Sequence, residues 1–108
     1  MKWQHLVLIA AAAVATVSCR QEEIRTRTFQ VPQLKNEHAV RIVVDALSKV
    51  DGVIPEKIQG GKGTVTITYD SMKVAVKNLE FVIAKAGFNA NDTPADPQAR
   101  EALPADCK

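Results

Sequence analysis

The fold is decided by the stretch GGKGTVTITYD at residues 60–70. Three glycines in four positions predict a tight turn, and the next residues alternate between apolar and hydroxyl side chains. Val65, Ile67 and Tyr69 share one side of this pattern. The stretch therefore predicts the second half of a β-hairpin with one buried face. It lacks the spacing of a phosphate-binding loop and precedes a strand instead of a helix, so a nucleotide site is not expected.

Upstream of the hairpin, the pattern predicts a strand, a helix and another strand. Thr26–Val31 alternates as a strand does. Asn36 is a suitable N-cap for a helix whose apolar residues recur at spacings of three and four as far as Val50. Val53–Ile58 follows as a second strand, in which Pro55 indicates a sheet edge or a bulge.

Downstream of the hairpin, the pattern predicts a second helix and a short last strand. Asp70 or Ser71 would cap the helix, which reaches Ala86 before a glycine ends it. Phe88–Ala90 would form the last strand. The order strand, helix, strand, strand, helix, strand predicts an α+β fold: a ferredoxin-like βαββαβ sandwich, with both helices on one face of a four-stranded antiparallel sheet.

The first residues have the pattern of a secretory signal. Lys2 supplies a basic start, and Leu6–Val17 is apolar but too short to span a bilayer. The following TVSC at residues 16–19 resembles the lipobox of bacterial lipoproteins, although leucine is usual where Thr16 stands. Lipidation of Cys19 is the favoured interpretation. Ordinary signal cleavage and an uncleaved apolar helix are the alternatives.

This interpretation divides the chain into four segments. Residues 1–18 would be the signal peptide and 19–25 a charged tether, followed by the domain at 26–91 and a C-terminal tail at 92–108. We expect a lipid-anchored protein of the cell envelope that faces the periplasm or the cell surface. The small net charge after cleavage does not favour nucleic acid as a partner.

Three stretches carry a family resemblance: ALSKVDGV at residues 46–53, VTITYD at 65–70 and AKAGF at 84–88. They resemble the heavy-metal-associated domain family, which includes copper chaperones and the periplasmic mercuric-ion-binding protein. The resemblance covers residues 27–91 and implies a role in metal handling. It also implies a Met-x-Cys-x-x-Cys loop whose two thiolates bind a soft ion.

The loop in question has lost those ligands. VPQLKNEHA at residues 31–39 occupies it, with Leu34 in place of the family methionine and Asn36 and Ala39 in place of the two cysteines. Neither Asn nor Ala can supply a thiolate. The resemblance therefore does not extend to the usual two-cysteine metal site.

His38, Asp106 and Cys107 remain as candidate metal ligands. His38 lies in the family's metal loop, whereas Asp106 and Cys107 end the tail. The simpler interpretation is an exposed histidine and a mobile tail with an exposed thiol. We expect the tail to have to cross the domain to reach the loop, and ordering so many residues costs about 1–2 kcal/mol each.

Two functions follow. The favoured one is a non-enzymatic envelope lipoprotein that serves as a binding or interaction module linked to metal transport or homeostasis, in contact with a metal transporter or another envelope protein. The alternative is a metal-ion carrier that uses Cys107 and His38 for Zn(II), Cu(I) or Hg(II). The chain has no serine, histidine and aspartate set and no cofactor fingerprint, so an enzyme is not expected.

Overall fold

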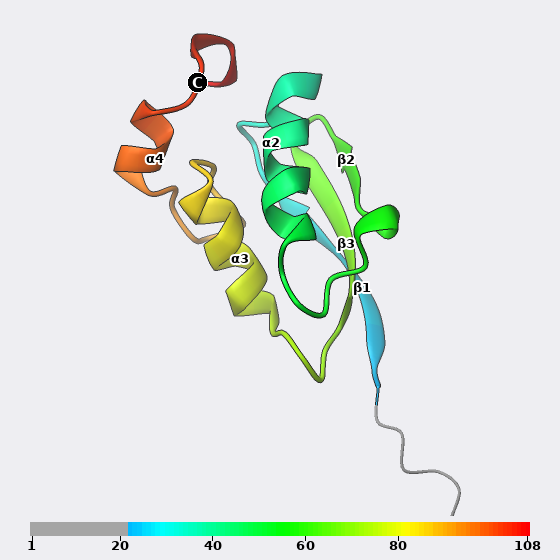
Figure 1. Ribbon diagram of the computed structural model, residues 1–108. Helices are drawn as coiled ribbons and strands as arrows, with labels where there is room; N and C mark the ends of the chain where they lie inside the picture. The colour runs from blue at the N-terminus through cyan, green and yellow to red at the C-terminus, as the bar shows by residue number, and fades with distance from the viewer. Residues whose placement is uncertain (1–21) are drawn as a thin grey trace, which may run out of the picture.

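The computed structural model describes residues 22–108, so the signal-peptide and Cys19 predictions lie outside the described residues. Two helices, α2 (Glu37–Ser48) and α3 (Val76–Lys85), pack on an antiparallel sheet (Figure 1). The sheet has the order β1-β3-β2. None of the helices in this part of the chain is long and apolar enough to cross a membrane. The α+β class and the antiparallel sheet are confirmed.

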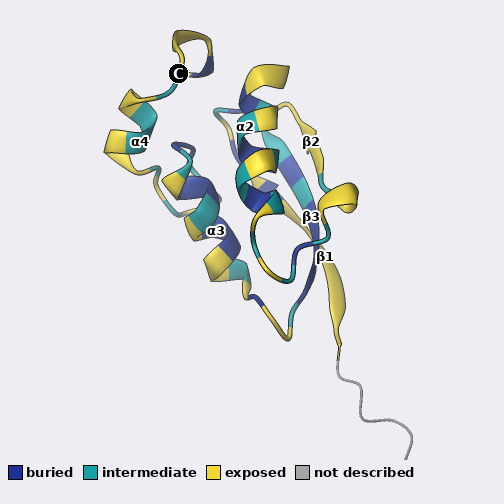
Figure 2. Cartoon of the chain, in the orientation of Figure 1, coloured by how far each residue is buried: buried dark blue, intermediate teal, exposed yellow. Residues whose placement is uncertain are grey.

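The core forms where the alternating strands meet the helices. The sheet consists of β1 (Ile24–Gln30), β2 (Gln59–Gly61) and β3 (Thr64–Asp70). The apolar side chains of β3 are buried and its threonines lie on the opposite face, as the period of two requires. The buried side chains that are largest and fully enclosed are Phe29, Phe88, Leu34, Leu47, Ile67, Leu79 and Ile83. Figure 2 shows the buried sides of both helices turned toward the sheet.

Helix α2 begins where the sequence predicts. The Asn36 side chain accepts a hydrogen bond from the Ala39 N–H at 2.8 Å. By contrast, α3 begins at Val76, five or six residues later than the predicted caps. Asp70 accepts from the Met72 N–H at 3.0 Å instead, and so caps a turn. Because the Asp70 side chain and carbonyl are used in this turn, the helix cannot start there.

The predicted strand Val53–Ile58 is interrupted. Val53 pairs singly with Tyr69, and Pro55–Lys57 then forms a 3-10 turn, η2, before β2 begins. The pairing with β3 resumes with three extra residues inserted, because Val53 faces Tyr69 whereas Gln59 faces Thr66. The expectation of a sheet edge or a bulge at Pro55 is confirmed, because β2 is an edge strand and the residues at Pro55 interrupt the pairing. The continuous strand is wrong.

The sheet has three strands within residues 22–108, so the prediction of a fourth strand at Phe88–Ala90 is wrong. The chain reverses at Asn91, whose φ of 52° lies in the left-handed region, and Ala90 pairs with Thr93. Asn91 still pairs with the end of β1: its N–H donates to the Gln30 carbonyl and its side chain accepts from the Gln30 N–H, both at 2.8 Å. Asparagine tolerates this conformation better than most residues. Asn91 is thus the single residue that pairs with β1 where a whole strand was predicted.

Glu80 on α3 stabilises this reversal. Its carboxylate accepts hydrogen bonds from Asn91 Nδ2 at 2.8 Å and from Thr93 Oγ1 at 2.9 Å. Lys77 Nζ lies 3.2 Å away. Glu80 is buried, and these bonds hold the pKa of its carboxyl below the ordinary value, with the Asn91 bond as the largest cause.

The tail packs on the domain instead of extending from it. Helix α4 (Pro97–Glu101) lies beside α3 (Figure 1). Arg100 donates to the Gly87 carbonyl at 2.9 Å. The last turn, η3 (Ala105–Cys107), packs against α2, and Cys107 is 3% exposed. The expectation of a mobile tail with an exposed thiol is therefore wrong.

Candidate metal centre

The loop that precedes α2 is closed on the β2–β3 turn. The Val31 N–H donates to the Gly63 carbonyl at 2.8 Å, and the Gly63 N–H donates to the Leu34 carbonyl at 2.9 Å. Leu34, in the family's methionine position, is 1% exposed and belongs to the core. Gln33 accepts from the Asn89 N–H at 2.6 Å, which ties the loop to the segment after α3. The loop is thus fixed on two sides.

The two positions that correspond to the family cysteines have structural roles. Asn36 uses its oxygen to cap α2, and its Nδ2 donates to the Asp106 carbonyl at 2.7 Å. Ala39 is fully buried and offers no ligand atom. A two-thiolate site for a soft ion does not fit these residues. Asn36 instead joins the start of α2 to the tail.

The tail brings the three candidate ligands together at this end of the domain. His38 Nδ1 lies 2.9 Å from Asp106 Oδ2, and Cys107 Sγ lies 3.8 Å from Asp106 Oδ1. One ligand atom from each residue falls within 4.8 Å of the others. His38 and Asp106 are half exposed, whereas Cys107 is buried beneath them. The cluster is therefore open to solvent on one side and closed by the core on the other.

The charges in the cluster favour an added cation. The hydrogen bond with His38 holds the pKa of Asp106 below its usual range, against the opposing effect of burial. Burial raises the pKa of the Cys107 thiol, and the negative charge of Asp106 raises it further. A neutral thiol next to a carboxylate becomes a thiolate most readily when a metal ion supplies the compensating charge.

The three ligand atoms would have to move to reach the spacing of a zinc site. Zinc binds sulfur, imidazole nitrogen and carboxylate oxygen at about 2.0–2.3 Å, so tetrahedral ligand atoms stand roughly 3.3–3.8 Å apart. The separations here reach 4.8 Å, and the bond between His38 and Asp106 would have to open. Three protein ligands with a fourth position open to solvent is a known arrangement for this ion.

The route of the tail explains why sequence reasoning placed the cluster too far apart. The sequence predicts a fourth strand, after which the tail would have to cross the domain to reach the loop. The reversal at Asn91 keeps the tail at the end where the loop lies. The segment NDTP at residues 91–94 has the composition of a turn, and this was the available signal. The second role of Asn36 and the burial of Glu80 had no sequence signal.

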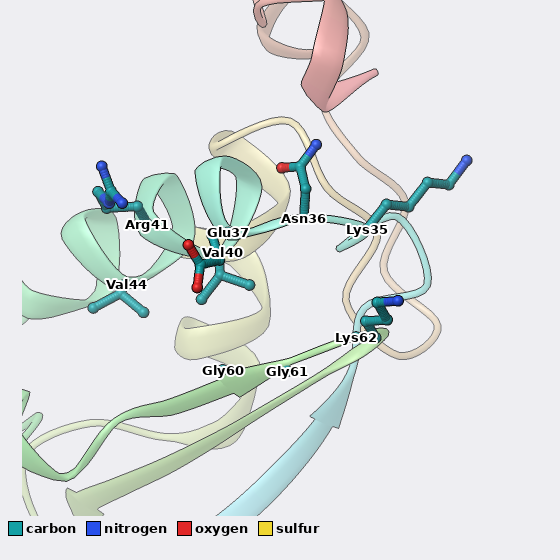
Figure 3. A pocket seen from close by; sticks show the side chains of 9 residues that line it. All are labelled: Lys35, Asn36, Glu37, Val40, Arg41, Val44, Gly60, Gly61 and Lys62. Carbon is teal, nitrogen blue, oxygen red and sulfur yellow. The ribbon is translucent and has the colours of Figure 1, made fainter.

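A separate surface pocket lies between α2 and β2 (Figure 3). It has a volume of about 510 Å³ and an apolar base that includes Val40 and Val44. Lys35, Arg41 and Lys62 line it together with Glu37, so the charges are mixed. The pocket shares Asn36 with the cluster but contains neither His38 nor the tail residues. It therefore does not belong to the candidate metal centre.

The chain is similar to proteins that handle metal ions. It is 29% identical over 63 residues to the copper chaperone CopZ of Bacillus subtilis (strain 168). These residues cover 58% of this chain and 91% of that protein. Oxidized MerP from Ralstonia metallidurans CH34 has a crystal structure that matches with a TM-score of 0.59 and 28% identity, over 64% of this chain and 96% of MerP. A CopZ metallochaperone structure matches with a TM-score of 0.57 and 26% identity, over 61% of this chain and 98% of that one. No family model matches.

The class that the fold and these relatives define is a small ferredoxin-like domain of the kind found in metallochaperones. Within that class, the sequence and the fold of this chain are similar to those of heavy-metal-associated domain proteins. Its two cysteines, Cys19 and Cys107, do not form a Cys-x-x-Cys pair. The chain thus has the family's fold and a different set of candidate ligands.

Proposed function

We propose that the protein is a non-enzymatic metal-binding module that holds its ion through His38, Asp106 and Cys107. The observation that carries this proposal is the convergence of imidazole, carboxylate and thiol atoms within 4.8 Å of one another. These residues come from the start of α2 and from the end of the tail, so folding alone brings them together. The similarity to the copper chaperone CopZ and to MerP supports a role in metal handling in general.

The ligand set favours a borderline ion. One thiolate, one imidazole and one carboxylate suit Zn(II) better than Cu(I) or Hg(II), which prefer more sulfur. Zn(II) is therefore the expected cargo, and Cu(I) and Hg(II) are the alternatives. A two-coordinate soft ion would require a second thiol, and the described residues contain only that of Cys107.

Metal binding is tested with purified protein that is kept reduced, by competition with a chromophoric zinc chelator. Asp106→Asn should lower Zn(II) affinity by about tenfold or more, because it removes a charged ligand and keeps the backbone bond to Asn36. Asp92→Asn is the matched control, since Asp92 is an exposed aspartate outside the cluster. Equal losses in the two variants, or no Zn(II) binding by the unaltered protein, would sink the proposal.

Cys107 requires a variant that preserves packing. Cys107→Ala should lower the affinity more than Asp106→Asn does, because the thiolate is the strongest ligand in the set. If this variant does not fold, as judged by circular dichroism, His38→Gln at the exposed side of the cluster provides the same test. Unchanged affinity in folded Cys107→Ala would show that the ion binds elsewhere.

We further propose that the protein acts in the cell envelope, anchored by lipid on Cys19, and that it serves a metal transporter or another envelope protein. The support is the signal-like start and the TVSC stretch at residues 16–19. The test is the mass of the mature N-terminus with and without Cys19→Ser. A mature chain without acyl groups in the unaltered protein would contradict the anchor.

The same domain without a metal ion would be an interaction module. The observation that favours this second function is the structural use of Asn36 and Ala39, the two positions where the family has its ligands. The zinc competition assay separates the two functions, because an interaction module predicts no saturable Zn(II) binding.

A further inference from the structure

Within residues 22–108, no strand pairs with the outer edge of β1 along most of its length. Glu23 and Val31 bond toward β3 and its turn: the Ser71 N–H donates to the Glu23 carbonyl, and the Val31 N–H donates to the Gly63 carbonyl, both at 2.8 Å. Backbone groups alternate in direction along a strand, so the odd-numbered residues of β1 bond to β3. The even-numbered residues, Ile24, Thr26 and Thr28, direct their N–H and C=O groups outward.

Among the contacts of residues 22–108, Gln30 is the one even-numbered residue of β1 with an outward partner, and it bonds to Asn91. This bond confirms the direction of the outward groups and marks the end of the free edge. Among residues 22–108, no segment continues the pairing from Asn91 along β1. Asn91 therefore occupies the first position of a neighbouring strand, and the remaining positions along β1 have no partner within residues 22–108.

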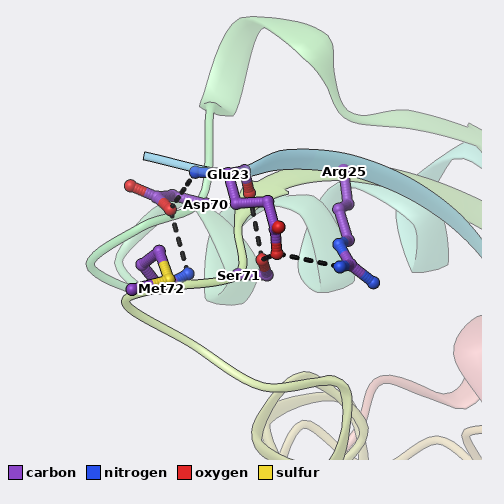
Figure 4. A network of polar contacts seen from close by, with 5 residues as sticks. All are labelled: Glu23, Arg25, Asp70, Ser71 and Met72. Carbon is purple, nitrogen blue, oxygen red and sulfur yellow. Dashed lines mark hydrogen bonds and ion pairs between the residues drawn. The ribbon is translucent and has the colours of Figure 1, made fainter. Parts of the chain in front are cut away.

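The edge is held in an extended form at both ends. At the far end, Glu23 donates from its N–H to Asp70 Oδ1 at 3.1 Å, and Ser71 Oγ donates to Glu23 Oε1 at 2.8 Å (Figure 4). At the near end, Asn91 fixes Gln30. A strand that binds here would meet a backbone that is already ordered, which lowers the entropy cost of binding.

The side chains of the edge are basic. Every residue from Ile24 to Thr28 is exposed, and Figure 2 shows this half of β1 as exposed. Arg25 pairs with Glu23 at 2.8 Å, whereas Arg27 makes no ion pair within the described part of the chain. The backbone groups of Arg25 and Arg27 point to β3, so these two residues would be non-hydrogen-bonded positions toward an added strand. In an antiparallel pair, facing side chains are closest at such positions.

A second copy of the chain fits this edge poorly. If two β1 strands pair antiparallel through all three free positions, Thr26 of one copy faces Thr26 of the other. Arg25 of each copy then faces Arg27 of the other. A shift of two residues sets Arg25 opposite Arg25 or Arg27 opposite Arg27. Like charges directly opposite each other are destabilising, so the same residues that oppose self-pairing favour an acidic strand.

We propose that the free edge of β1 binds an extended acidic segment of a partner protein by strand addition. The backbone groups of Ile24, Thr26 and Thr28 provide the hydrogen bonds. Arg25 and Arg27 select carboxylates at alternate positions of the bound segment. This surface is independent of the metal cluster, so each can be lost without the other.

The probe is a capped seven-residue peptide that alternates glutamate with valine or threonine. On its addition, amide hydrogen exchange should slow at Thr26 and Thr28, whose N–H groups point outward, and change little at Arg25 and Arg27, which are already bonded. The same peptide with lysine in place of glutamate should not bind. Equal binding of both peptides, or protection elsewhere only, would overturn the proposal.

A charge swap tests selection directly. Arg27→Glu should weaken binding of the glutamate peptide by about three- to tenfold and allow the lysine peptide to bind. Arg41→Glu changes the net charge equally at an exposed position on α2 and should leave both affinities unchanged. Sedimentation of the unaltered protein alone should give a monomer. A dimer that protects Thr26 would assign the edge to a second copy and overturn the proposed partner.

Discussion

The two halves of this fold end their helices in the same way and then diverge. After α2, Gly52 adopts a φ of 101° and is followed by Val53; after α3, Gly87 adopts a φ of 103° and is followed by Phe88. Val53 leads through a bulge into β2, which pairs at the sheet edge. Phe88 leads within three residues to the reversal at Asn91. Within residues 22–108 the sheet has no fourth strand, which leaves one edge of β1 open and lets the tail pack beside the loop that precedes α2.

The largest expected difference between the halves is in the core. Phe88 is fully buried and Val53 nearly so, and the aromatic side chain fills more volume. Phe88→Ala should lower the free energy of unfolding by about 3–5 kcal/mol, and Val53→Ala by about 1–2 kcal/mol. Urea denaturation checks both. Similar losses would mean that the second half does not depend on Phe88 as a core residue.

The reversal is the next strongest point. Asn91→Ala removes the side-chain bonds to Glu80 and Gln30. It also puts alanine, which makes no side-chain hydrogen bond, at a positive φ. We expect a loss of about 2–3 kcal/mol in unfolding free energy, measured by urea denaturation. Asn91→Gly should recover the backbone part alone. Asp92→Ala, at the next exposed position, is the control and should change little.

Alanine substitutions of Gly52 and Gly87, which end the two helices, distinguish an effect on stability from an effect on metal binding. A Cβ at Gly87 would lie 2.9 Å from Leu103 Cδ1 in the tail, and a Cβ at Gly52 would lie 2.9 Å from Lys73 Cβ, far from it. Each substitution by alanine should cost about 1–2 kcal/mol, because each φ is positive. Only Gly87→Ala should also weaken Zn(II) binding, because it displaces the tail. Equal zinc affinities in the two variants would contradict this.

The smallest effect concerns pH. Because the pKa of Glu80 in the folded protein is below its ordinary value of 4.5, its contribution to stability is present above that value. The contribution is lost as the pH falls through the folded pKa. Glu80→Gln should therefore be less stable than the unaltered protein at neutral pH, and the difference should shrink in acid. Thermal denaturation between neutral and acidic pH measures it.

The sequence predicted those parts of the fold that depend on local pattern. The alternation at residues 64–69 and the cap at Asn36 are local signals, and both elements are where the pattern indicated. The course of the chain after Gly87 depends on a buried carboxylate on α3 and on β1, which are distant in sequence. No local pattern carries that information.

The candidate site divides in the same way. His38, Asp106 and Cys107 could be named from their chemistry, and the missing cysteine pair was visible in the loop. Their convergence could not be predicted, because it follows from the reversal at Asn91 and from the bond between Asn36 and Asp106. Residue type indicates which atoms can bind a metal ion, whereas tertiary contacts decide which of them meet.

The burial of Cys107 has a kinetic consequence. The thiol lies beneath the surface, so a donor or acceptor protein cannot reach it while η3 remains packed on α2. Exchange of an ion would then wait for local opening of the last turn, and its rate would follow the frequency of that opening instead of the rate of encounter. A bound ion would stabilise the packed form of η3. The ion would therefore stay bound longer, because the turn would open less often.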